Sequence, residues 1–171
     1  KTSALVRAGY LGNIWMVRCD SYGWPAFRSG NFRLDWSRSG GGVLIDTGVH
    51  MLYLLRHLAG EAQTVSAVLS YGLREEMEGE NNALVSVEHQ NGVLGEVTAS
   101  YSARLPFWQL GYPDGWEQRV EVYGTEGSLK LDLIQGVLHF HTEQLHSVPE
   151  LGDWRIDQKV VGSFVECRLP N

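Results

Sequence analysis

Asp46 and His50 are the two side chains whose types and spacing best suit acid–base chemistry in this sequence. They follow the glycine run Gly40–Gly42 and lie in an apolar stretch that predicts a helix from about Gly42 to Ala59. Side chains four residues apart share one face of a helix, so the carboxylate and the imidazole can meet. An imidazole, with a reference pKa of about 6.5, is a suitable general base near neutral pH.

Tyr53 and His57 continue the same stripe, and nearly all other positions of the predicted helix are apolar. A helix that is apolar around most of its circumference is expected to be buried, so this stripe should face partners or a wet cleft. Gly48, inside the helix, costs about 1 kcal/mol relative to alanine, which indicates a close neighbour. Gly60 is well placed to end the helix.

Other interpretations of these residues remain open. An aspartate and a histidine four apart also suit a surface ion pair, and Asp46, His50 and His57 together would suit a metal-dependent lyase or hydrolase. His57 is better explained by a structural hydrogen bond near the helix end. Three further histidines have spacing that zinc can use, but no carboxylate or thiol is clearly paired with them, so no metal is expected. They are His139, His141 and His146.

The elements around this helix are predicted to be strands. Alternating apolar residues and two turn signals, at 90–92 and 124–127, favour antiparallel hairpins. The expected strands are 14–20, 64–71, 83–89, 93–101, 119–123, 128–133 and 137–141, the last of them an edge strand, and Val160–Cys167 is expected to begin a last helix. A connection of about twenty residues before the glycines is long enough to suggest a function.

These elements predict one α+β domain. We expect an open, mostly antiparallel sheet of six to seven strands, with one long helix and a short C-terminal helix on one face. The other face is left open, either for pairing of subunits or for solvent.

Composition narrows the classes of function. The 171 residues carry a formal net charge of −6 and no basic run, which argues against nucleic-acid binding. The acidic run Glu75–Glu80 is expected to be a solvated loop. No apolar run is long enough for a membrane span, and two distant cysteines, Cys19 and Cys167, suit a reducing, cytoplasmic compartment.

Several motifs give the sequence a resemblance to a known family. The run Phe32–Leu55, containing G-G-G-x₃-D-x-G-x-H, resembles the signature of the Gfo/Idh/MocA oxidoreductases, as do Leu11–Ile14, Gly92–Gly95 and Tyr123–Leu129. The similarity is to the C-terminal domain of that family and spans most of residues 1–171. The family's Rossmann domain, with its E-K-P lysine, is not in this sequence, so we expect the chain to be a C-terminal half.

The resemblance implies a role in NAD(P)-dependent oxidation or reduction of a sugar, polyol or related hydroxy compound. It implies that His50 is the base, that Asp46 orients the imidazole or holds a substrate hydroxyl, and that NAD or NADP binds the missing domain rather than this chain. From position alone, Arg33, Asp35 and Trp36 of the long loop are candidates to close over the substrate. Trp24, Trp36 or Trp108 could stack on a sugar.

The implied partners are the substrate and further copies of the chain, as a homodimer or tetramer through the sheet. Tyr53 replaces an acidic residue usual in the family, a departure that bears on substrate choice. Two alternatives remain: a non-catalytic assembly module, or a relative with redox-neutral chemistry on a sugar. The isolated chain is expected to be inactive.

Overall fold

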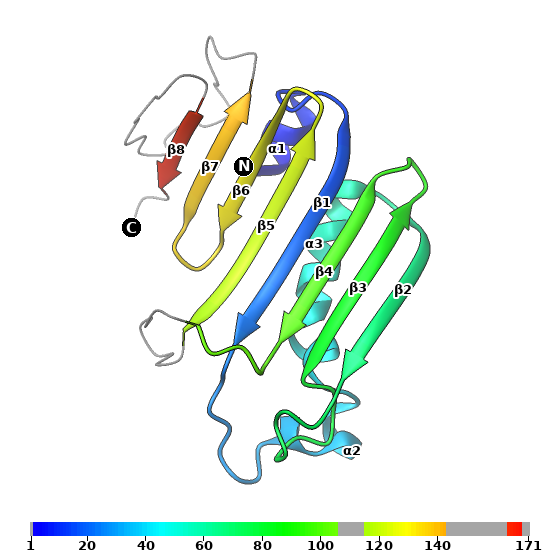
Figure 1. Cartoon of the computed structure of the whole chain (residues 1–171), viewed down its shortest axis with the longest axis vertical. Coiled ribbons are helices and arrows are strands. Elements are labelled where there is room, and N and C mark those ends of the chain that lie inside the picture. Colours follow the sequence, from blue (N-terminus) through cyan, green and yellow to red (C-terminus); the bar gives the residue numbers. More distant parts are fainter. Residues whose placement is uncertain (1, 106–114, 143–163, 169–171) are drawn as a thin grey trace.

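The computed structural model describes residues 2–105, 115–142 and, as backbone, 164–168. These residues form one eight-stranded sheet with its helices on one side (Figure 1). The elements in chain order are α1 Thr2–Arg7, β1 Ile14–Gly23, η1 Phe32–Leu34, α2 Trp36–Ser39, η2 Leu44–Gly48, α3 Val49–Ala59, β2 Ala62–Ser70, β3 Asn82–His89, β4 Leu94–Ser100, β5 Trp116–Gly124, β6 Gly127–Asp132, β7 Val137–Thr142 and β8 Phe164–Arg168.

The sheet runs in the order β2-β3-β4-β1-β5-β6-β7-β8. The pair β1 and β4 is parallel, and every other neighbouring pair is antiparallel. The open, mostly antiparallel sheet is therefore confirmed, with all seven expected strands present and their ends shifted by a few residues. The first strand, β1, lies in the middle of the sheet, between the antiparallel group β2–β4 and the antiparallel group β5–β8 (Figure 1).

The C-terminal helix expected from Val160 to Cys167 is wrong over the described part of that range. Phe164–Arg168 forms β8, which pairs antiparallel with β7, so β7 is not an edge strand. The physical reason is that the outer edge of β7 presents unpaired N–H and C=O groups, which a further strand satisfies. The short helix α1 was not predicted, because six residues carry too little periodicity to be recognised.

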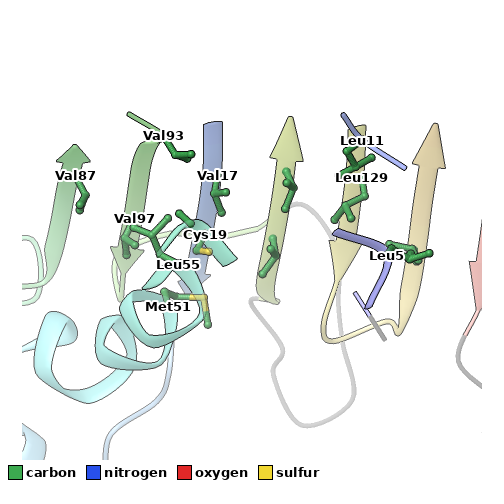
Figure 2. Packing of buried hydrophobic residues seen from close by; sticks show 14 of the residues in the cluster. Leu5, Leu11, Val17, Cys19, Met51, Leu55, Val87, Val93, Val97 and Leu129 are labelled. Carbon is green, nitrogen blue, oxygen red and sulfur yellow. The ribbon is translucent and has the colours of Figure 1, made fainter. Parts of the chain in front are cut away.

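The core lies between the sheet and the helices on one face. Met51 and Leu55 of α3 lie over the inward side chains of β1 and β4, Val17, Cys19 and Val97 (Figure 2). The same cluster extends toward β6 and β7 through residues of the N-terminal segment, Leu5 and Leu11, and through Leu129. Packing on this one face fixes the position of the helix that carries the candidate site.

The predicted helix is present, but its first turn is a π-helix, η2, which continues directly into α3. Gly48 packs closely, as predicted, because a Cβ there would lie 2.8 Å from Leu44 and 3.5 Å from Ala99. Gly60 ends the helix at φ +96°, with its N–H bonded to the carbonyl of Arg56.

The expectation that this helix is buried on nearly all sides is wrong. Its inward positions Met51, Leu55 and Ala59 are buried, yet Val49 and Tyr53 are 42% and 69% exposed. A single sheet can cover only one side of a helix, so the apolar residues on the far side remain in contact with solvent. The described residues contain no helix that is long and apolar enough to cross a membrane.

Candidate active site

The glycine run forms the turn that leads into the helix. Gly40 ends α2 in the left-handed region at φ +73°, a conformation that costs glycine nothing. Gly42 is buried, and its carbonyl accepts the N–H of Asp46 at 3.2 Å as the helix starts. This turn places Asp46 on the half-exposed edge of the helix, next to the segment that contains Arg33.

Asp46 is the centre of a hydrogen-bonded cluster. Its Oδ2 accepts the Nε–H of Arg33 at 2.5 Å and also a hydrogen bond from the hydroxyl of Tyr101. Because Tyr101 donates its only hydroxyl proton to Asp46, Thr47 acts as donor in the 2.5 Å contact between the Thr47 and Tyr101 hydroxyls. Both donors to Asp46 reach Oδ2, so, among the described residues, Oδ1 is left available for another donor.

The cluster keeps Asp46 ionised. Partial burial opposes ionisation, but the hydrogen bonds from Arg33 and Tyr101, with the charges of Arg33 and His50, outweigh it and lower the pKa of Asp46. Burial, followed by the hydrogen bond to Asp46, raises the pKa of Tyr101, so its hydroxyl stays protonated. The site therefore presents a fixed carboxylate at neutral pH.

His50 lies one turn after Asp46, in the first turn of α3, and it is exposed. The charge of His50 makes a small contribution to the lowered pKa of Asp46, which is consistent with their four-residue spacing. The imidazole is open to a reactant from outside the chain, which a general base requires.

The three loop candidates occupy different places. Arg33 binds Asp46, and its guanidinium lies 4.5 Å from the centre of the Phe32 ring. Asp35 instead caps α2, with Oδ1 accepting the N–H and the hydroxyl of Ser37 at 2.9 and 2.6 Å. The Trp36 side chain is 47% exposed. Only Arg33 is brought to Asp46.

A hollow of about 140 Å³ lies beside this cluster. Its lining includes Arg33, Asp46 and Tyr101, together with Ile45 and Met77, but neither Asp35 nor Trp36. It is large enough for a few water molecules or part of a small ligand. The polar groups of the cluster therefore border a small recess rather than flat surface.

The remaining candidates from the sequence lie elsewhere. His57 accepts or donates a 2.9 Å hydrogen bond with Ser3 of α1, the structural contact expected near the helix end. His139 and His141 both lie on β7, and the described residues contain no cluster of three potential metal ligands. His146 and Trp108 lie outside the described residues.

Trp24 contacts two arginines through its ring. The guanidinium groups of Arg74 and Arg104 lie 4.3 and 3.9 Å from its ring. Stacking on a sugar would have to displace one of them.

Sequence reasoning missed Tyr101, and it misjudged the acidic run. Tyr101 follows β4, and its alternation with Val97 and Ala99 already placed it on the helix-facing side, where a polar tip needs a partner. Glu80 was expected in a solvated loop, but only 4% of it is exposed. Its backbone lies against the helix start, so the loop folds inward there.

The sequence of this chain matches the GFO/IDH/MocA C-terminal domain over residues 1–130. Among curated proteins, D-apiose dehydrogenase of Rhizobium rhizogenes is 28% identical over 89 residues, which are 52% of this chain and 24% of that protein. The scyllo-inositol 2-dehydrogenase (NAD(+)) of Bacillus subtilis is 31% identical over 99 residues, 56% of this chain and 26% of that protein. The chain thus spans about a quarter of the length of these relatives.

A solved structure shows the same fold. Levoglucosan dehydrogenase in complex with NADH and levoglucosan superposes with a TM-score of 0.71 and 22% identity, covering 96% of this chain and 42% of that one. At 22% identity this similarity shows a shared fold and nothing about function.

Proposed function

The chain belongs to the GFO/IDH/MocA C-terminal domain family, and on that premise we propose that it is the substrate-binding and oligomerisation domain of an NAD(P)-dependent oxidoreductase acting on the CH–OH group of a sugar or polyol. The names of its relatives, D-apiose dehydrogenase and scyllo-inositol 2-dehydrogenase (NAD(+)), support this class of substrate and cofactor. The observation that carries the proposal is an exposed imidazole, His50, beside a carboxylate that the fold holds ionised.

The glycine turn of this chain does not fit a dinucleotide. Helix N-termini bind phosphate through free N–H groups, but the N–H groups of Gly42, Val43 and Leu44 all bond to Glu80. The cofactor would therefore be held by another domain of the intact protein.

The outer side of the helix supports a contact with such a domain. Ile45, Val49 and Tyr53 follow one another at four-residue spacing and are 54%, 42% and 69% exposed. Apolar residues grouped on one helix face are typical of an interaction surface. A domain packed there would enclose His50 in a crevice and exclude water from it.

The role of the chain's own residues is then the movement and placement of a proton. His50 takes the proton of the substrate hydroxyl as the CH–OH group is oxidised, a role for which an exposed imidazole is suited. Asp46, fixed through Oδ2, offers Oδ1 either to the imidazole or to a second substrate hydroxyl. Arg33 and Tyr101 keep that carboxylate charged and oriented, and Asp35 and Trp36 remain candidates for contact with the substrate from the loop.

The experiment is a kinetic comparison of His50→Ala and His57→Ala in the intact protein, with NAD⁺ or NADP⁺ and a panel of polyols. Loss of a general base costs about 10²- to 10⁴-fold, so kcat should fall by that factor in His50→Ala. His57, exposed on the same helix and bonded to Ser3, is the matched control and should leave kcat within about twofold. Equal kcat in the wild type and His50→Ala, with circular dichroism unchanged, would refute the assignment.

The second face of the sheet supports the oligomerisation part of the proposal. A shallow hollow of about 320 Å³ there is lined by Met16, Leu84 and Leu94 among others, and the last two are 48% and 52% exposed. We propose that two chains pair through this face, as a dimer or within a tetramer. If the intact protein oxidises no polyol, this assembly role alone would be its function.

The buried, free thiol of Cys19 is in keeping with a cytoplasmic setting.

A further inference from the structure

Glu80 binds the start of the helix that carries Asp46 and His50. Its Oε2 accepts the N–H of Gly42 at 2.9 Å, and its Oε1 accepts the N–H of Leu44 at 3.0 Å. Its backbone carbonyl accepts the N–H of Val43, also at 2.9 Å. One residue thus satisfies three successive N–H groups that a helix start leaves without intrahelical partners.

The two backbones touch, and only glycine permits this. A Cβ on Gly42 would lie 1.9 Å from the carbonyl oxygen of Glu80, and a Cβ on Gly79 would lie 2.6 Å from the Cα of Gly42. Neither neighbour is a movable side-chain tip. The helix start is therefore fixed against this segment with little room for adjustment.

The same segment also holds the residues around Arg33. Glu78 donates its N–H to the carbonyl of Leu34 at 3.1 Å, and its Oε2 accepts the N–H of Trp36 at 2.7 Å. Residues 78–80 consequently bind both partners of the ion pair: the segment that presents Arg33 and the turn that presents Asp46. The link to Asp46 is short, since its N–H bonds to the carbonyl of Gly42.

We propose that Glu80 is a positioning residue, which sets Asp46 at hydrogen-bond distance from Arg33 by fixing the start of the helix. The catalytic meaning of this role rests on the proposed function, because Asp46 serves the reaction only if the intact protein is the oxidoreductase. The positioning itself can be measured in the 171-residue chain without any activity.

The test is hydrogen exchange at the Nε–H of Arg33, followed by NMR in the wild type, Glu80→Gln and Glu75→Gln. Glu75 lies in the same acidic run and is exposed, so its variant makes the same change of charge without touching the helix start. A glutamine at 80 can accept only one of the two N–H groups. We expect exchange at Arg33 to accelerate about tenfold or more in Glu80→Gln and to stay as in the wild type in Glu75→Gln.

The backbone N–H of Val97, in the core strand β4, reports global unfolding in the same samples. Equal acceleration at Val97 and at Arg33 would mean that Glu80 only stabilises the fold, and this would overturn the proposal, as would unchanged exchange at Arg33. If Glu80→Gln does not fold, Glu80→Asp replaces it, with the charge retained and the reach shortened by one methylene, and the same outcomes apply. In the intact protein, kcat should fall about tenfold in Glu80→Gln with KM little changed. Failure to oxidise polyols would refute the proposed function and leave the exchange result intact.

Discussion

Tyr101 donates a hydrogen bond to Asp46, although 55 residues separate them in the sequence. The hydroxyl shares the Oδ2 atom with the Nε–H of Arg33, so two donors from different segments hold one oxygen. One comes from the end of β4 and the other from η1, and each is fixed by its own element. The carboxylate is thereby oriented before any ligand arrives, which is how preorganised sites reduce the cost of reaching the reactive geometry.

Removing the Tyr101 hydroxyl should raise the pKa of Asp46. Tyr101→Phe deletes one hydrogen bond to the ionised carboxylate and leaves the ring in place, so the carboxyl should titrate at higher pH than in the wild type. The pKa of Asp46 is measured from the ¹³C NMR shift of its side-chain carboxyl across pH 2–7. The control is Tyr53→Phe, whose hydroxyl is on the exposed helix face. Identical titration of Asp46 in Tyr101→Phe and wild type would show that the hydroxyl does not hold the charge.

Asp46 should also make the stability of the chain depend on pH. Its pKa is lowered in the folded state, so its contribution to the free energy of unfolding is present above an unfolded pKa of about 3.9 and is lost as the pH falls through the folded value. Asp46→Asn cannot titrate, and its urea unfolding curves should change less between pH 5 and pH 2.5 than those of the wild type. Parallel losses of stability in the two proteins over that range would contradict the assignment.

The glycines at the helix start should differ sharply in their tolerance of alanine. Gly42→Ala would put a methyl group 1.9 Å from the backbone oxygen of Glu80, whereas Gly41→Ala meets side-chain atoms, with Ile45 Cγ2 nearest at 2.9 Å and Ile45 Cβ at 3.4 Å. Ile45 is an exposed side chain that can turn away, but the Glu80 backbone cannot. Urea denaturation should show a loss of about 3 kcal/mol or more for Gly42→Ala and under about 1 kcal/mol for Gly41→Ala. Similar losses at both sites would mean that the contact is adjustable.

Pairing through the open sheet face can be tested by solution mass. The wild-type chain should be a dimer in size-exclusion chromatography with light scattering, and Leu84→Arg should be a monomer, because a charge in the apolar hollow would be buried without a partner. Tyr53→Arg, on the helix side, should remain dimeric. A wild-type chain that is strictly monomeric at high micromolar concentration would rule out this interface.

Most helices and strands near the site could be predicted from the sequence because they depend on short-range patterns of residue types. Alternation with period two gave the strands, the apolar run gave the helix, and Gly60 marked the helix end. The placing of Asp46 and His50 on one helix face followed from helical spacing alone, since residues four apart share a face. Even the close packing at Gly48 could be expected from the cost of a glycine inside a helix.

Contacts between distant segments could not be predicted in this way. From the sequence, Arg33 and Asp35 were equally good candidates for contact with the substrate, because they lie in the same loop. In the structure Asp35 caps α2, whereas Arg33 forms an ion pair with Asp46. The sequence did not show that β7 would pair with β8 rather than end the sheet. It also did not show that α3 would be covered on one side only.

The sequence by itself therefore determined the long helix, seven of the eight described strands and the placing of Asp46 and His50 on one helix face, because each depends on residues within a few positions of one another. The tertiary structure alone decided which donors reach Asp46 and what covers the start of its helix. Glu80 lies in the loop before β3 and Tyr101 follows β4, so both lie at the same end of this antiparallel strand pair. Their contacts with the helix depend on how the sheet packs against it. Such contacts arise from packing across the whole domain, and no spacing along the chain encodes them.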